Sequence, residues 1–129
     1  MGQQQLLLIV LGVIIVGIAI VVGINLFQAS AIDANRNAVI SDLNNLAAMA
    51  QQYYKKPTSL GGGGNSFVGF ALPTGMGSNA NGTYTISSAG TATQIVFQAV
   101  GTEKGTDGTN GVTHTATVTA TAITIAKTN

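Results

Sequence analysis

An uninterrupted apolar segment near the N-terminus constrains this chain more than any other feature. Residues 6–27 read LLLIVLGVIIVGIAIVVGINLF, without a charged residue and with Asn25 as the one strongly polar side chain. About 22 residues at ~1.5 Å each give a helix of ~33 Å, enough to cross the ~30 Å apolar core of a bilayer. A signal peptide would carry a basic residue ahead of a shorter apolar core, whereas the first basic residue here is Arg36. We therefore predict a membrane-spanning helix.

The low charge of the chain excludes several classes of function. Charged residues make up 7% of the sequence and the net charge is +1, whereas about a quarter of the residues in a soluble domain are charged. No basic patch is available to follow a phosphate backbone, so we expect no nucleic-acid binding by bulk charge. The chain has no cysteine, which excludes disulfides and thiolate metal sites. We expect no cofactor and no small-molecule substrate.

Little sequence precedes the apolar segment. Met1, Gly2 and the glutamines 3–5 stand before it, without the basic residues that commonly flank a membrane span. We expect this chain to be the processed form of a precursor from which a basic leader has been removed.

Helical periodicity continues beyond the apolar segment. Apolar side chains recur mostly at three- and four-residue steps through 32–54, with polar side chains on the opposite face. No proline interrupts 1–56, and Pro57 follows Lys55 and Lys56, which suit the negative end of a helix. We predict one continuous helix of about 50 residues, ~75 Å long. Its apolar stripe must pack on another element and comprises Ile32, Val39, Ile40, Leu43, Leu46, Ala47, Ala50, Tyr53 and Tyr54.

After Pro57 the chain becomes rich in Gly, Thr, Ser and Ala. The glycine run 61–64 lacks the GK[ST] sequence of a phosphate-binding loop and predicts a flexible loop over 58–66. Runs of β-forming residues separated by turn-rich stretches predict strands at 67–72, 83–87, 93–100 and 112–126. Asn110-Gly111 is a hairpin-turn signal ahead of the last run.

A sheet of this size cannot bury a large core alone, so the apolar stripe on the helix must supply the missing half. We predict an α+β fold in which a long N-terminal helix packs against a small antiparallel β-sheet. The expected organisation is an apolar stem helix over 1–28, an amphipathic continuation of the same helix over 29–56, and a Gly/Thr-rich β domain over 57–129.

The last predicted strand alternates with period two, which is typical of a half-buried antiparallel strand. We expect its threonine face to point outward and its Val/Ala face to meet the helix. The alternation changes phase near Ala122, where a bulge or a bend is expected. The outward face comprises Thr113, Thr115, Thr117, Thr119 and Thr121.

No constellation of residues predicts catalysis, so we expect that the chain is not an enzyme. His114 is the only histidine and has no metal-ligand partner at zinc spacing. Glu103, Asp107 and Asn110 could line a cation, but their spacing differs from that of an EF-hand and is typical of polar turns. Asn81 begins an Asn-Gly-Thr glycosylation sequence, a pattern with many false positives.

A helix that is apolar and then amphipathic, followed by a small β-rich domain, resembles the type IV pilin family and its secretion-system pseudopilin relatives. The resemblance covers the whole architecture and is most specific over residues 1–56. In that family a leader peptidase cleaves the precursor and methylates the new N-terminus, which would be Met1 here. Gln5 stands where the family usually has a Glu that pairs with the N-terminal amine of a neighbouring subunit, so only a hydrogen bond remains available. Val22 stands in place of the family's helix-breaking proline.

The resemblance implies a structural subunit of an extracellular filament at the cell surface, with a membrane-inserted precursor pool. Its implied partners are further copies of the chain in a helical homopolymer, the inner membrane before assembly, and the prepilin-type leader peptidase with the pilus assembly machinery. The alternatives are a pseudopilin of a type II secretion-type apparatus and an archaeal pilin-like surface filament protein. In an exported filament, O-linked sugars on Thr113, Thr115, Thr117 and Thr119 are plausible. The residues expected to assemble the stem are Leu6, Leu7, Leu8, Ile9, Leu11, Ile14, Ile15, Ile18, Val21 and Val22.

Overall fold

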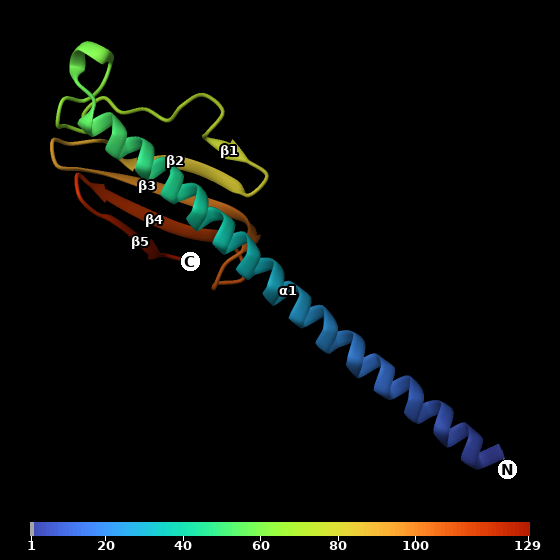
Figure 1. Ribbon diagram of the computed structural model, residues 1–129. Helices are drawn as coiled ribbons and strands as arrows, with labels where there is room; N and C mark the ends of the chain where they lie inside the picture. Colours follow the sequence, from blue (N-terminus) through green and yellow to red (C-terminus); the bar gives the residue numbers. More distant parts are fainter. Residues whose placement is uncertain (1) are drawn as a thin grey trace. The chain divides into compact units, whose positions relative to one another are not determined.

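The computed structural model describes residues 2–129, which form a long helix followed by a small sheet (Figure 1). Helix α1 (Gly2–Lys55) has 54 residues. The chain divides into two compact units, Met1–Ala31 and Ile32–Asn129, and we call the second the head unit. After α1 come the short 3-10 helix η1 (Thr58–Leu60) and the strands β1 (Ser78–Asn79), β2 (Gly82–Ser88), β3 (Gln94–Lys104), β4 (Gly111–Thr119) and β5 (Ile123–Lys127). The predicted α+β fold is confirmed.

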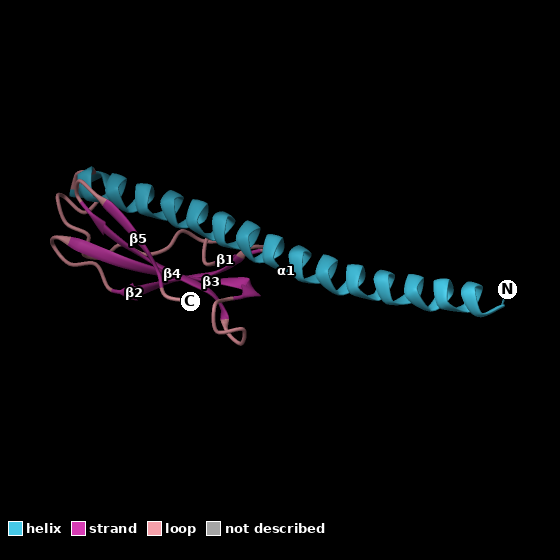
Figure 2. Ribbon diagram, turned by 90° about the horizontal axis from the view of Figure 1, so that it is seen from below, coloured by secondary structure: helices cyan, strands magenta, loops and turns pink. Residues whose placement is uncertain are grey.

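The sheet is an antiparallel meander of five strands in the order β1-β2-β3-β4-β5. Within the head unit, the last turns of α1 run along one face of this sheet (Figure 2). The apolar stripe of the helix meets the inward side chains of the strands there, because each partner has only one apolar face to bury. The core comprises Val39, Leu43, Leu46, Ala47, Ala50, Phe67, Tyr84, Ile95, Phe97, Ala99, Ala116 and Val118.

The threonine face of β4 points outward, as predicted. Burial alternates strictly along the strand, with Val112, Ala116 and Val118 at 0% exposure and the threonines between them only half-buried. The predicted single strand over 112–126 is wrong, because the chain reverses at 120–122 and returns as β5. The change of phase near Ala122 is therefore a hairpin turn, closed by the backbone N–H of Thr119 donating to the Ala122 oxygen at 2.9 Å.

The predicted strand over 67–72 is also wrong, because this segment is irregular. Gly69 has a φ of +86°, which interrupts an extended backbone. Its aromatic residues pack one by one instead: the Phe67 ring lies 4.8 Å from that of Tyr54, and the Phe70 ring lies 5.7 Å from that of Phe97. The short strand β1 lies in a stretch where the sequence predicts only turns.

The glycine run 61–64 does not hang free as a flexible loop but closes the C-terminal end of α1. The N–H groups of Gly63, Gly64 and Asn65 donate to the carbonyl oxygens of Tyr53, Lys56 and Tyr54 at 2.7, 2.9 and 2.7 Å. The last carbonyls of a helix lack hydrogen-bond donors within the helix, and the N–H groups of this loop supply those donors. The end of the helix next to Pro57 is confirmed.

Candidate functional site

The apolar surface of the first half of α1 is the largest feature of the chain that its fold leaves without an explanation. We call the side chains of residues 6–27 the stem surface. Its large apolar side chains are between 50% exposed, at Val22, and 76% exposed, at Phe27. The stem residues predicted to assemble all lie on this surface: Leu6, Leu7, Leu8, Ile9, Leu11, Ile14, Ile15, Ile18, Val21 and Val22.

The stem surface is apolar around the whole helix, not along one stripe. Its side chains from Leu6 to Leu11 are all more than half exposed although they point in every direction around the axis. The most apolar window has a mean hydropathy of 3.3 and is 0% buried, and α1 is long and apolar enough to cross a membrane by length and composition. A helix that is apolar all round is stable where lipid or protein surrounds it completely.

Three glycines without side chains interrupt the apolar residues of the stem surface. A Cβ atom built on Gly12, Gly17 or Gly23 would meet nothing within 4 Å. Glycine lets the backbone of another helix approach closely, which strengthens packing between helices in an apolar environment. These glycines weaken a helix in water, so their presence fits a segment that is buried by a partner.

Of the two N-terminal residues that the sequence singles out, the structure describes only Gln5. Gln5 is exposed within α1 and lies on the same helix as the stem surface. Met1, the candidate for processing and methylation, lies outside the described residues.

Polar contacts that the sequence does not reveal join α1 to the sheet inside the head unit. Asn35 is only 9% exposed, and its Nδ2 donates to the backbone oxygen of Asn81 at 2.8 Å while its Oδ1 accepts from the N–H of Glu103 at 3.3 Å. These bonds satisfy the amide, which would otherwise be costly to bury. The only sequence signal for this role is a polar residue at a stripe position, one helical turn before Val39.

A second polar group lies around Asp42. Its carboxylate accepts hydrogen bonds from the Tyr84 hydroxyl and from the side-chain amides of Asn79 and Asn81, the latter two at 3.0 and 3.2 Å. Burial raises the pKa of Asp42, but these three hydrogen bonds outweigh burial and leave the pKa below its usual value. Burial and the Asp42 carboxylate raise the pKa of Tyr84 far above its usual value. The group holds the turn before β2 against α1.

The glycan candidates occupy two different environments. The Asn81 amide nitrogen, which would carry an N-linked sugar, is half-buried and bonded to Asp42. Thr113, Thr115, Thr117 and Thr119 lie on the outward face of β4, half-exposed.

The only histidine of the chain is buried in the head unit. His114 is 3% exposed on the inward face of β4, and its Nδ1 has no partner in the part of the chain that the structure describes. Burial lowers the pKa of His114, and the positive charges of Arg36 and Lys127 lower it further.

The Asp107 carboxylate forms hydrogen bonds within the 105–110 turn. The Asp107 carboxylate accepts from the backbone N–H groups of Thr109 and Asn110 and from the Asn110 side chain, all within 2.9 Å. These bonds lower the pKa of Asp107 to about 2. Across residues 2–129, no three His, Asp or Glu side chains gather closely enough to hold a metal ion.

No family model, curated protein or solved structure matches this chain. The described residues present an exposed apolar helix surface over residues 6–27, and the head unit has a core of its own.

Proposed function

We propose that this chain is the structural subunit of an extracellular type IV pilus-like filament. Before assembly, the stem surface lies in the membrane. On assembly, the stem surfaces of many copies pack together and form the centre of a helical filament with the heads outside.

The observation that carries this proposal is that every large apolar side chain of the stem surface is at least half exposed. Burying one Leu, Ile or Val side chain that would otherwise face water lowers the free energy by about 1.5–3 kcal/mol. The stem surface presents such side chains between Leu6 and Phe27. Both a bilayer and a bundle of like helices can supply that burial. The same surface therefore fits a subunit that is stored in lipid and then exchanges lipid for other copies.

The absence of charge supports the exchange. The first charged residue of the sequence is Asp33, which already belongs to the head unit. A charged side chain at the centre of a bilayer costs about 3 kcal/mol or more, and an unpaired charge inside a helix bundle is costly for the same reason. No charged side chain in the stem opposes either environment.

The head unit supports the exchange as well. Its core is formed by residues from Val39 to Val118 and includes no stem residue. Moving the stem from lipid to protein therefore leaves the packing of the head unchanged. Processing at Met1 by a leader peptidase and an inter-subunit contact through Gln5 are further parts of the proposal.

A pair of matched substitutions tests it. Ile15→Asp places a carboxylate on the stem surface, where Ile15 is 57% exposed, and Val68→Asp places one on the head, where Val68 is 59% exposed. Filaments sheared from cells that produce each variant are counted by negative-stain electron microscopy. We expect Ile15→Asp, and likewise Leu8→Asp, to abolish filaments, because each subunit would bury a carboxylate at a cost of about 3 kcal/mol or more. Val68→Asp retains them.

Normal filament yield from Ile15→Asp would contradict the proposal. Absence of filaments from the unchanged chain, with the protein confined to the cell envelope, would instead favour a pseudopilin or a membrane-anchored module.

A further inference from the structure

Residues 127–129 connect several parts of the head unit, and we call this segment the clasp. The backbone N–H groups of Thr128 and Asn129 donate to the oxygen of Thr113 at 3.0 and 3.1 Å. In return, the N–H of Thr113 donates to the Asn129 oxygen at 3.1 Å. These backbone hydrogen bonds hold the clasp against the start of β4.

Asn129 extends the clasp to α1 and to the 105–110 turn. Arg36 on α1 donates from Nη1 to the backbone oxygen of Asn129 at 3.0 Å. The Asn129 side chain accepts at Oδ1 from the backbone N–H of Asp107 at 3.1 Å. Its Nδ2 donates to the oxygens of Asn110 and Gly111 at 3.3 and 3.1 Å. One residue of the clasp therefore joins the helix, the turn and β4.

His114 lies beside the clasp, because it follows Thr113 in β4 and is the register partner of Lys127 in β5. The His114 side chain is 3% exposed, and its Nδ1 is buried without a hydrogen-bond partner among residues 2–129. An unpaired polar atom is costly to bury, and an unpaired charge is costlier. The closed clasp therefore favours the neutral imidazole ring.

The charges that act on His114 favour the neutral ring as well. Burial lowers the pKa of His114, and the positive charges of Arg36 on α1 and Lys127 on β5 lower it further. The register partner on β3 is Ala99, which carries no charge. From the 105–110 turn, the Asp107 carboxylate is held by hydrogen bonds inside that turn.

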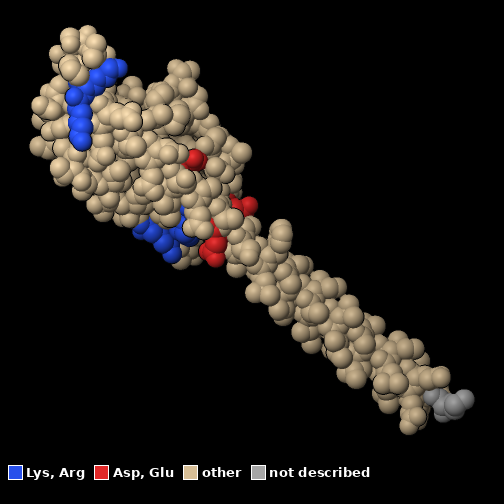
Figure 3. Space-filling view, in the orientation of Figure 1, with Lys and Arg blue, Asp and Glu red and all other residues tan. Residues whose placement is uncertain are grey.

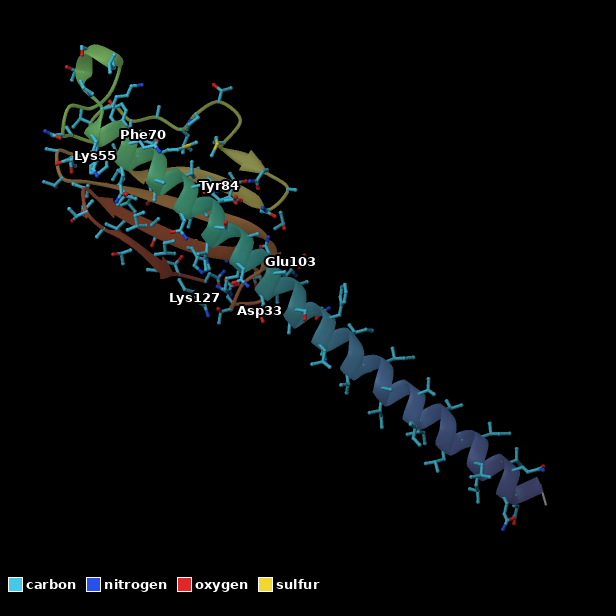
Figure 4. The ribbon with its side chains drawn as sticks, viewed as in Figure 1. Asp33, Lys55, Phe70, Tyr84, Glu103 and Lys127 are labelled. Atoms are coloured by element: carbon cyan, nitrogen blue, oxygen red, sulfur yellow. The ribbon has the colours of Figure 1, made fainter. Side chains whose placement is uncertain are left out.

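Acidic side chains also lie at this end of the head unit. Figure 4 shows Asp33 and Glu103 near Lys127, and Figure 3 shows acidic and basic atoms close together on the surface. Asp33 and Glu103 are exposed to water, which screens their charges, and neither is among the groups that shift the pKa of His114. A proton on His114 therefore adds a third positive charge beside Arg36 and Lys127.

We propose that protonation of His114 opens the clasp, releasing residues 127–129 from β4 and, with Asn129, freeing the 105–110 turn. In the open form, water reaches the charged ring and Lys127 moves away from it. This inference does not depend on the proposed function, because every group that it uses lies in the head unit.

The direction of the pH dependence follows from the two forms of the clasp. In the open form, the pKa of His114 returns to its ordinary value of about 6.5, whereas in the closed form the pKa is lower. The closed form therefore binds fewer protons. The clasp stays closed above about pH 6.5, and opening becomes more favourable as the pH falls below that value.

Hydrogen exchange of the full chain in detergent micelles, followed by NMR, tests the clasp. The reporters are the backbone N–H groups of Thr113, Thr128 and Asn129, because each donates across the contact. We expect their protection factors, which correct for the intrinsic effect of pH on exchange, to fall by up to about tenfold per pH unit below about pH 6.5. The N–H of Gly63, bonded to the Tyr53 oxygen at the C-terminal end of α1, should keep its protection and shows that the head remains folded.

Three variants identify the groups responsible. His114→Leu removes the titrating ring and its unpaired nitrogen, so protection at the clasp should no longer depend on pH. Lys127→Glu places a carboxylate at the register partner of His114, where it favours the charged ring, so the fall should disappear. Lys104→Glu makes the same change in charge on β3, where the register partner is Gly111, and should keep the fall. Lys104 and Lys127 are both exposed, so neither substitution disturbs the core.

Four results would overturn the proposal. Protection at the clasp could be independent of pH in the unchanged chain, or it could fall equally in the unchanged chain and in His114→Leu. Equal falls in Lys127→Glu and Lys104→Glu would remove the role of the charge beside the ring. A fall that includes the Gly63 N–H to the same extent would show unfolding of the whole head instead of opening of the clasp.

Discussion

The glycine run at the end of α1 leads to a prediction that can be worked out from distances. A Cβ atom on Gly63 would lie 1.8 Å from the backbone oxygen of Ser66 and 2.8 Å from Cε1 of Tyr53. Neither gap can hold a methyl group. Because the Ser66 oxygen belongs to the backbone, Gly63→Ala forces the loop itself to move.

Moving this loop breaks the closure of the helix. The N–H groups of Gly63 and Asn65 donate to the α1 carbonyls of Tyr53 and Tyr54, and that of Gly64 donates to the oxygen of Lys56 directly after the helix. Each such bond contributes about 1 kcal/mol. Alanine recovers about 0.4–1 kcal/mol by restricting the unfolded chain. Losing all three bonds therefore costs about 2 kcal/mol net, and for a domain of this size that lowers the melting temperature by about 10 °C.

The measurement is urea and thermal unfolding of the fragment 29–129, followed by circular dichroism. Gly77→Ala is the matched control, because the nearest atom to its Cβ is the Tyr84 oxygen at 3.9 Å, an ordinary contact. We expect this control to stay within about 0.5 kcal/mol of the unchanged fragment. Equal stability of Gly63→Ala and Gly77→Ala would refute the claim that this loop is pinned to the helix.

Two further predictions concern the head unit. The fragment 29–129 should be a folded monomer by size-exclusion chromatography and circular dichroism, because its core includes no stem residue; persistent large oligomers would mean that the head drives association. His114 should make this fragment sensitive to acid: burial and the charges of Arg36 and Lys127 lower its folded pKa, so the stability it contributes is fully present above the unfolded pKa of about 6.5 and is lost as the pH falls below that value. His114→Leu should weaken the fall in melting temperature between about pH 7 and pH 5, and an unchanged fall would assign the acid sensitivity to other groups.

Local turn chemistry is where the sequence patterns fail. The run 67–72 is rich in β-forming residues, yet Phe67 and Phe70 pack separately against Tyr54 and Phe97. A strand needs a neighbouring strand to pair with, whereas an aromatic residue is also stabilised by burial in a pocket outside a sheet. The reversal at 120–122 gives only a change of phase in the sequence, which a bulge would give as well.

The sequence by itself determines the stem and the two-faced elements of this protein. An apolar run longer than a bilayer is thick, helical spacing from Ile32 to Tyr54 and strict alternation along β4 each follow from the geometry of one element. Tertiary structure alone decides which polar groups meet: the amide of Asn35 with Asn81, the carboxylate of Asp42 with Tyr84, and the loop N–H groups of Gly63 and Asn65 with carbonyls of α1. Periodicity records whether a side chain faces inward. It holds no information about the partner across the core, because that partner comes from a distant part of the chain and is brought there by folding.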